Sequence, residues 1–115
     1  MRVTADGPRI ATYGAFWPFY LGEHARAATR AWHFVGTGLV LAALAAGIWT
    51  GDWRLFAIAP VCGYLFAWIS HFFVEHNRPA TFTYPLWSLV SDFRMFFLYV
   101  IGRLGPELRR YGIDG

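Results

Sequence analysis

Four histidines and one glutamate are the residues in this sequence best suited to metal chemistry. His33 and His71 each lie inside a long apolar run, where ionisable groups are rare and tend to be functional. Glu75 follows His71 by four residues, which places both side chains on one face of a helix. His24 and His76 lie just outside the two runs. Because imidazoles with a carboxylate or water suit non-haem iron(II), zinc or manganese, these residue types predict a metal site.

The two apolar runs that carry His33 and His71 cover residues 31–50 and 55–74. Each run holds 20 residues without Asp, Glu, Lys or Arg, and only the sequence GDWR separates them. A helix rises about 1.5 Å per residue, so each run is about 30 Å long, the thickness of a hydrocarbon core. Charged residues make up 15% of the chain, against about 25% in soluble domains. The pattern predicts an all-α integral membrane protein built on a transmembrane helical hairpin.

The arginines on either side of the runs predict the orientation of this hairpin. Arginines precede the first run and follow the second, whereas the connecting loop carries only Arg54, offset by Asp52. The flanking set comprises Arg26, Arg30, Arg78, Arg94 and Arg103. Because positive charge marks the cytoplasmic side, we expect a multi-pass protein of the cell membrane with both termini in the cytoplasm.

The hairpin predicts that the histidines converge near its cytoplasmic boundary. In antiparallel helices of equal length, His33 and His71 lie at nearly the same depth. His24 precedes His33 by nine residues, which on one straight helix means opposite sides and about 13.5 Å of rise. The two can share a metal only if the chain bends between them. We expect this bend at residues 28–29, with Thr29 as the N-cap of the first spanning helix.

The remaining segments are expected to flank one membrane domain over residues 13–104. Residues 1–12 predict a flexible N-terminal tail, and residues 105–115 a polar C-terminal tail. Short interfacial helices are expected at 18–28 and 85–104. The second of these has apolar residues at helical spacing, but its uncharged stretch is too short to span a bilayer. The expected fold is therefore a transmembrane hairpin plus two interfacial helices.

Other polar residues near the expected histidine cluster have ordinary interpretations as well. Glu75 and Arg78 have the spacing of an i,i+3 ion pair, and His76 fits an interfacial or capping position. Asp92, on the helix at 85–104, is expected to face the histidines. Basic residues are few outside the membrane flanks, so nucleic-acid binding is not expected.

The motifs that hold these residues resemble the membrane 2-hydroxy-fatty-acid dioxygenase family. They are FYLGEH followed after eight residues by His33, HFFVEHNRPA beginning at His71, and SDFRM at 91–95. Characterised fungal members are Fe(II) enzymes of fatty-acid α-oxidation, which convert a 2-hydroxy fatty acid and dioxygen into the acid one carbon shorter. The resemblance implies His24, His33 and His71 as metal ligands and Glu75 as the catalytic motif glutamate. His76 is not carried over, and this chain lacks the extra apolar segments of the fungal members.

The resemblance also implies a set of partners. These are the lipid bilayer, a long-chain 2-hydroxy fatty acid and dioxygen, with Fe(II) as cofactor. Arg30 or Arg78 would hold the substrate carboxylate, and the acyl tail would lie in the bilayer along residues 39–46 and 61–68. The polar residues expected around the ligands are His76, Asn77 and Asp92. Assembly into a homo-oligomer is left open by the sequence.

Two other functions are compatible with the same residues. His33 and His71, facing each other at one depth, have the arrangement of a bis-histidine haem protein. Alternatively, the amphipathic segment at 85–104 could serve a non-enzymatic lipid-binding or assembly protein.

Overall fold

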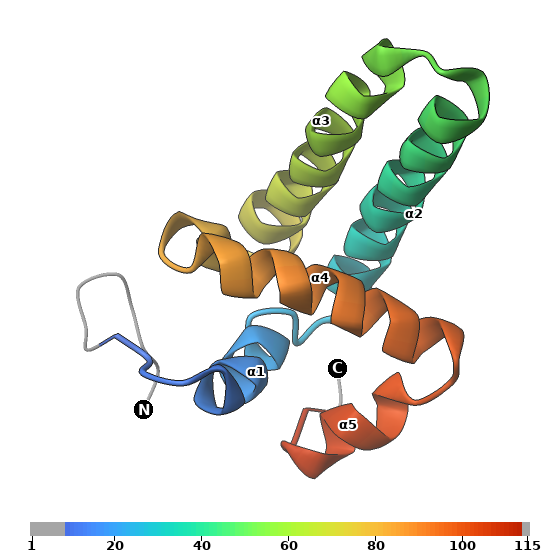
Figure 1. The fold of residues 1–115 in the computed structure, drawn as a ribbon. Coiled ribbons are helices and arrows are strands. Elements are labelled where there is room, and N and C mark those ends of the chain that lie inside the picture. Colours follow the sequence, from blue (N-terminus) through green and yellow to red (C-terminus); the bar gives the residue numbers. More distant parts are fainter. Residues whose placement is uncertain (1–8, 114–115) are drawn as a thin grey trace.

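In the computed structural model, residues 9–113 are described, apart from the side chain of Thr81, and their secondary structure is entirely helical (Figure 1). The elements are α1 (Tyr13–Gly22), α2 (Ala27–Thr50), α3 (Trp53–Ile69), the π-helix η1 (Ser70–Glu75), the 3-10 helix η2 (Ala80–Phe82), α4 (Pro85–Val100) and α5 (Leu104–Arg110). The all-α class expected from the sequence is therefore confirmed.

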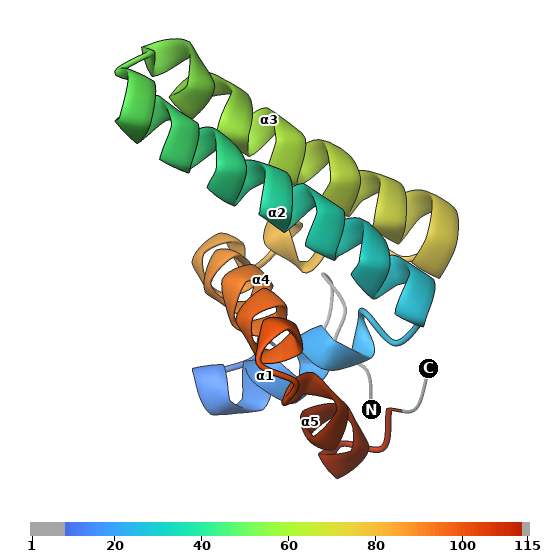
Figure 2. The ribbon, with the colours of Figure 1, turned by 90° about the vertical axis from the view of Figure 1, so that its right-hand side faces the viewer.

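A long antiparallel hairpin of α2 against α3 and η1 dominates the molecule (Figures 1 and 2). At its tip Gly51 adopts a left-handed conformation with φ 74°, and the Asp52 side chain caps α3 by accepting from the Arg54 backbone N–H at 3.1 Å. Two helices, Ala27–Thr50 and Trp53–Glu75, are long and apolar enough to cross a membrane. The first begins four residues before the apolar run that predicted it.

The other three α-helices form a compact base at the open end of the hairpin. We call α1, α4 and α5 the base; α4 crosses between the hairpin and the two shorter helices (Figures 1 and 2). Its core consists of Phe16, Trp17, Tyr20, Leu21, Ala80, Tyr84, Met95, Leu104 and Leu108. The Trp17 Nε1–H donates to Glu107 at 2.8 Å, which ties α1 to α5. The base is thus held by a largely aromatic core of its own.

The entry to the hairpin differs from the sequence prediction. The first short helix covers Tyr13–Gly22 instead of 18–28, because the Thr12 side chain caps it by accepting from the Ala15 N–H at 3.2 Å. The bend expected at 28–29 lies earlier, over residues 23–26. Thr29, expected as an N-cap, is therefore inside α2, whose N-cap is Arg26.

The C-terminal segment also differs from its prediction. The helix expected at 85–104 ends at Val100, and the chain turns at Gly102 with φ 76°. Most of the predicted polar tail at 105–115 belongs to α5. Leu104 and Leu108 lie one helical turn apart and are 5% and 8% exposed, so the segment folds because it buries this pair in the base.

The expected N-terminal tail falls largely outside the described residues, which begin at residue 9. Its described part is tied to the base. The Ile10 N–H donates to the Tyr84 hydroxyl at 2.8 Å, and the Arg9 guanidinium donates to the Thr83 carbonyl at 3.1 Å. These bonds hold the chain in place just before α1.

Candidate metal centre

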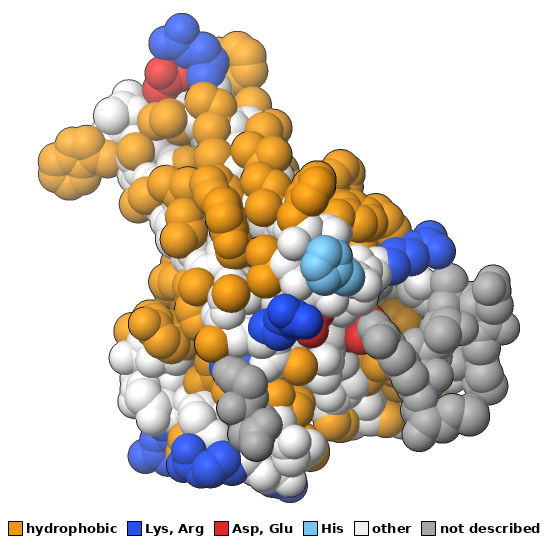
Figure 3. Space-filling model, turned by 180° about the vertical axis from the view of Figure 1, so that it is seen from behind, with side chains coloured by type: hydrophobic (Ala, Val, Ile, Leu, Met, Phe, Trp, Pro, Cys, Tyr) orange, Lys and Arg blue, Asp and Glu red, His pale blue; other side chains and the backbone are white. Residues whose placement is uncertain are grey.

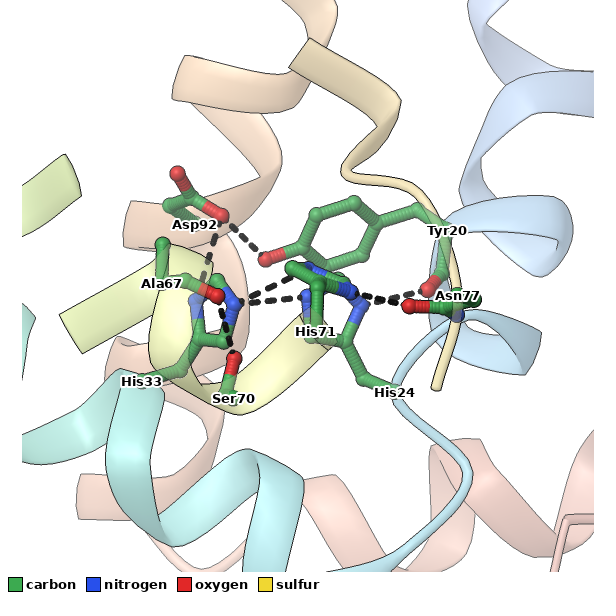
Figure 4. Close-up of polar contacts among 8 residues, drawn as sticks. All are labelled: Tyr20, His24, His33, Ala67, Ser70, His71, Asn77 and Asp92. Carbon is green, nitrogen blue, oxygen red and sulfur yellow. Dashed lines mark hydrogen bonds and ion pairs between the residues drawn. The ribbon is translucent and has the colours of Figure 1, made fainter. Parts of the chain in front are cut away.

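Three histidine side chains meet where the hairpin joins the base (Figure 4). His33 lies in α2, His71 in η1 and His24 in the loop between α1 and α2; they are 5%, 2% and 1% exposed. The Nε2 atoms of His24 and His33 are 3.0 Å apart, and those of His33 and His71 are 3.1 Å apart. We call these residues the histidine trio. Three residues from three different segments of the fold thus bring the same ring nitrogen close together.

Hydrogen bonds on the opposite ring nitrogens fix how two of these imidazoles are protonated. The Nδ1 of His24 lies 2.7 Å from the Tyr20 carbonyl, which can only accept, so this Nδ1 carries the proton. The Nδ1 of His71 lies 2.6 Å from Asn77 Oδ1. Asn77 Nδ2 donates to the Glu23 carbonyl at 3.0 Å, which turns its oxygen toward His71. The neutral rings of His24 and His71 therefore present unprotonated Nε2 atoms.

The histidine trio therefore has too few ring protons to form a hydrogen bond at each of its Nε2–Nε2 contacts. His33 can place at most one Nε2–H between two acceptors, so at least one close nitrogen–nitrogen contact has no hydrogen. Two nitrogens bound to one ion at about 2.0–2.1 Å, with angles of about 90–110°, lie about 2.8–3.4 Å apart. The separations within the trio fit this requirement. Three buried imidazoles, two of them with carbonyl oxygens as partners on Nδ1, form a donor set that could hold a metal ion.

Burial keeps His24 in the form that a metal requires. Desolvation, followed by the neighbouring His33 and His71, lowers the pKa of His24 well below its ordinary value. The His24 ring also packs on the Tyr20 ring, with centroids 4.2 Å apart. At neutral pH the ring is therefore uncharged and its Nε2 lone pair is free to coordinate.

His71 depends on an irregular end to the second hairpin helix. The α-helix widens to a π-helix at Ser70–Glu75, a form often found at functional sites. His76 then adopts a left-handed conformation with φ 61°, which is uncommon for a residue other than glycine. This reversal allows the Asn77 backbone N–H to donate to the His71 carbonyl at 2.8 Å, while the Asn77 side chain reaches the His71 ring. The local fold thus positions both His71 and its partner.

Arg30 holds the loop that carries His24. Its side chain is 8% exposed, and Nη1 donates to the carbonyls of His24 and Ala25 at 2.8 and 2.9 Å. The guanidinium therefore binds the backbone of the bend. Arg30, which with Arg78 was expected to hold the substrate carboxylate, is not among the residues that line the cavity described below.

Glu75 joins the end of η1 to the start of α2. Its carboxylate accepts from the Arg26 backbone N–H at 3.0 Å and from the Thr29 hydroxyl at 2.7 Å. An acidic group in this place supplies the cap that the Arg26 side chain does not make. Among the described residues, the possible metal-ligand atoms of His24, His33 and His71 lie within 4.8 Å of one another, and Glu75 does not belong to this group. In this geometry Glu75 positions the helices that carry His33 and His71.

Asp92 of α4 faces the trio from the base, as the sequence led us to expect. Its Oδ1 lies 3.7 Å from His33 Nδ1 and also accepts a hydrogen bond from the Tyr20 hydroxyl (Figure 4). Burial raises the pKa of Asp92 to about 7, against a lowering by the Tyr20 bond. Burial and Asp92 likewise raise the pKa of Tyr20 well above its ordinary value. Asp92 thus lies within ion-pair distance of one ring of the histidine trio.

A cavity of about 440 Å³ opens beside the histidine trio and runs along the hairpin. Its polar end is lined by Tyr20, His24, His33, His71, Ser88 and Asp92. Its other walls are mainly apolar and include Val40, Leu44, Phe56, Pro60 and Phe93. Leu44 is 11 residues beyond His33, which corresponds to about 16 Å along α2. The cavity thus joins a polar end at the histidines to a long apolar part along the hairpin.

The structure separates the remaining predicted residues from this cavity. Arg78 and His76 are exposed and line a different, open depression, where the Arg78 guanidinium lies 5.1 Å from the centre of the Phe82 ring. Tyr20 and Ser88 line the cavity but were not predicted. Tyr20 had a signal in the sequence, because it precedes His24 by one helical turn. Ser88 had none that distinguishes it from other helix serines.

The fold and the site define a helical protein with three buried histidines that could hold a metal ion at one end of an apolar cavity. The sequence matches the family described as 2-hydroxy-palmitic acid dioxygenase Mpo1-like over residues 10–104, and the chain belongs to this family. The matched region includes the trio, the hairpin and α4. Comparison with curated proteins and with solved structures found no match.

Proposed function

We propose that this chain is an Fe(II)-dependent membrane dioxygenase that converts a long-chain 2-hydroxy fatty acid into the fatty acid one carbon shorter. The observation that carries the proposal is the convergence of three Nε2 atoms at the polar end of an apolar cavity. The family to which the chain belongs is described by the same kind of reaction. Imidazole ligands with open positions suit iron(II), which would supply the activation of dioxygen.

The proposed reaction balances without a further reductant. The bond between C1 and C2 of the 2-hydroxy acid breaks, C1 leaves as carbon dioxide, and C2 becomes the new carboxyl carbon. The substrate loses four electrons, which one dioxygen molecule accepts, and water is the remaining product. The protein therefore has to bind the acid, hold it beside the metal ligands and keep competing water away. A buried site at the end of an apolar cavity meets these needs.

The cavity walls support an acyl chain as the apolar part of the substrate. Val40, Leu44, Phe56 and Pro60 extend the cavity away from the trio, along the groove between α2 and α3. The groove lies within the two helices that are apolar enough to cross a membrane. A fatty acid that partitions into the bilayer would then reach the site from the lipid.

The surface of the hairpin supports its insertion into a bilayer. In the most apolar 18-residue stretch of each hairpin helix, only 22% and 17% is buried, whereas core helices of a soluble protein are mostly buried. Hydrophobic side chains cover the hairpin; a basic and an acidic side chain lie together at its tip, and other basic side chains lie near the middle of the molecule and at the far end of the base (Figure 3). Trp49 and Trp53 at the tip are 90% and 71% exposed, as in an interfacial aromatic belt. We place the base and both termini on the cytoplasmic side.

The trio argues against the haem alternative. Two axial imidazole nitrogens lie on opposite faces of a haem, about 4 Å apart across the iron. The Nε2 atoms of His33 and His71 are 3.1 Å apart, and the Nε2 of His24 lies 3.0 Å from that of His33. A porphyrin plane has no room between these rings. The lipid-binding alternative makes no use of the trio and is separated by metal analysis.

The deciding experiment uses protein purified without oxygen and reconstituted in lipid nanodiscs. Metal analysis should find about one iron per chain, in line with a single three-histidine site. On addition of 2-hydroxypalmitate and oxygen, mass spectrometry should detect pentadecanoate and carbon dioxide. Palmitate, which lacks the 2-hydroxyl group, is the control substrate and should give neither product. Protein that retains no metal, or iron-loaded protein that leaves 2-hydroxypalmitate unchanged, would overturn the proposal.

A further inference from the structure

Ser88 of α4 has a buried hydroxyl that forms no hydrogen bond within the described part of the chain. The residue is 2% exposed and lines the cavity that begins at the histidine trio. A buried hydroxyl without a partner costs free energy, and such groups are few in folded proteins. A serine in a helix can usually bond to the carbonyl of the preceding turn. That Ser88 does not do so indicates a partner of another kind.

Ser91, three residues further along α4, provides the contrast. Its side chain is also fully buried, at 0% exposed, but its Oγ lies 2.9 Å from the Tyr13 hydroxyl. It does not line the cavity. Of these two buried serines of one helix, the one that lines the cavity has no hydrogen-bond partner among the described residues, and the one that does not line it has one. The missing partner of Ser88 is therefore to be sought in the cavity.

The position of Ser88 indicates which part of a ligand it would meet. Asp92, which faces His33, lies one helical turn beyond Ser88, so both side chains occupy the same face of α4. Ser88 therefore belongs to the polar end of the cavity. The two arginines expected to hold a carboxylate do not line it. The Tyr20 hydroxyl already donates to Asp92, and Ser88 is left as a neutral donor at this end.

We propose that the Ser88 hydroxyl donates a hydrogen bond to the carboxylate of a long-chain fatty acid bound in this cavity. The proposal rests on the proposed function for the class of ligand, a carboxylic acid with an apolar chain. It assigns to α4 the recognition of the head group, while the hairpin binds the acyl chain. A hydrogen bond to a charged group is the kind that one serine can supply, and its loss is measurable.

The test compares two ligands with the same chain length, palmitate and hexadecanol, in nanodisc-reconstituted protein purified without oxygen. Binding can be followed by intrinsic fluorescence, because Trp68 lines the cavity. Ser88→Ala should weaken palmitate binding about tenfold, as expected for one hydrogen bond to a charged group. Hexadecanol binding should change by less than about twofold, since the apolar contacts are unaltered. Ser88→Thr, which keeps a hydroxyl, should retain most of the affinity for palmitate.

The control variant is Ser91→Ala, which removes an equally buried hydroxyl from the same helix outside the cavity. It should bind both ligands as the wild type does. Metal content should remain unchanged in all three variants. Palmitate binding to Ser88→Ala with wild-type affinity would overturn the proposal, and so would an equal loss for both ligands. Failure of the proposed function has another signature: palmitate still binds through Ser88, but 2-hydroxypalmitate is not turned over.

Discussion

The hairpin and the base use the same kinds of residue in opposite ways. In the base, aromatic and aliphatic side chains such as Phe16, Leu21 and Met95 are completely buried against one another. In the hairpin, α3 contributes one buried residue, Ala59, while large side chains such as Val61 point outward at 63% exposed. A protein in water would not leave such surface uncovered. One region therefore buries its apolar side chains against one another, whereas the other exposes them, which supports the proposed insertion of the hairpin into a bilayer.

The candidate metal centre lies at the junction of these two regions. His33 and His71 belong to the hairpin, whereas His24 lies in the loop that leads from the base. A metal ion on the histidine trio would therefore join the regions. By binding His24 together with His33 and His71, the ion would tie the loop that leaves α1 to both helices of the hairpin and so contribute to holding the base against it.

The largest effect is expected from removing a member of the histidine trio. Replacement of His24, His33 or His71 by alanine should abolish metal retention, because two imidazoles leave the ion without its third protein ligand. Metal content of anaerobically purified protein measures this directly. Turnover of 2-hydroxypalmitate should be lost as well, while the protein still inserts into membranes. His76→Ala is the matched control, since its exposed side chain lies outside the trio. Equal metal content in all four variants would contradict the site.

A smaller loss is expected where the base buries its C-terminal helix. Leu108→Ala should destabilise the protein by about 2–4 kcal/mol, because it leaves a cavity in the core of the base. Leu86→Ala is the control: this side chain is 74% exposed, and the change should stay within about 0.5 kcal/mol. Unfolding by sodium dodecyl sulfate in mixed micelles measures both. Equal stability of the two variants would mean that α5 is not part of the base.

Replacing Asn77, the hydrogen-bond partner of His71, should have an intermediate effect on metal binding. Asn77→Ala removes the acceptor on His71 Nδ1 and should weaken metal affinity about 10–100-fold, the usual range for such partners. Asn77→Asp keeps an acceptor but loses the donor to the Glu23 carbonyl, so its affinity should lie between those of Asn77→Ala and the wild type. Competition with a fluorescent zinc chelator measures the affinity. Unchanged affinity in Asn77→Ala would show that this bond does not orient the ring.

The hairpin was predictable because length and apolarity alone specify it. Two uncharged runs separated by a short loop leave one compact arrangement, and that arrangement places His33 and His71 at one depth. The need for a bend before His33 followed from nine-residue spacing on a regular helix. The meeting of the trio thus follows from simple geometry and from the resemblance to a family.

The parts that were not predicted depend on backbone groups that carry no sequence pattern. Arg30 donates to two carbonyls that only the bend exposes, and Glu75 accepts from a backbone N–H across the hairpin. The left-handed residue at His76 has no glycine to indicate it. By contrast, α5 had a signal that was overlooked: Leu104 and Leu108 one turn apart, with Arg109 and Arg110 in the last turn.

The smallest effect, and the sharpest test of packing in the hairpin, comes from two glycines of α2. A Cβ on Gly36 would lie 2.8 Å from the Cβ of Phe66 in α3, whereas a Cβ on Gly38 would meet nothing within 4 Å. Alanine at either position favours the helix by up to about 1 kcal/mol. At Gly36 this gain is outweighed by overpacking, which costs about 1–3 kcal/mol because Phe66 Cβ cannot move without its helix.

Gly36→Ala should therefore be less stable than the wild type by up to about 2 kcal/mol, and Gly38→Ala as stable or slightly more so. The same unfolding measurement in mixed micelles compares them. Because Gly36 is less than one turn from His33, separation of the helices there should also weaken metal retention in Gly36→Ala alone. If both alanine variants were equally stable, α2 and α3 would not pack in this register, and the meeting of His33 with His71 would need another cause.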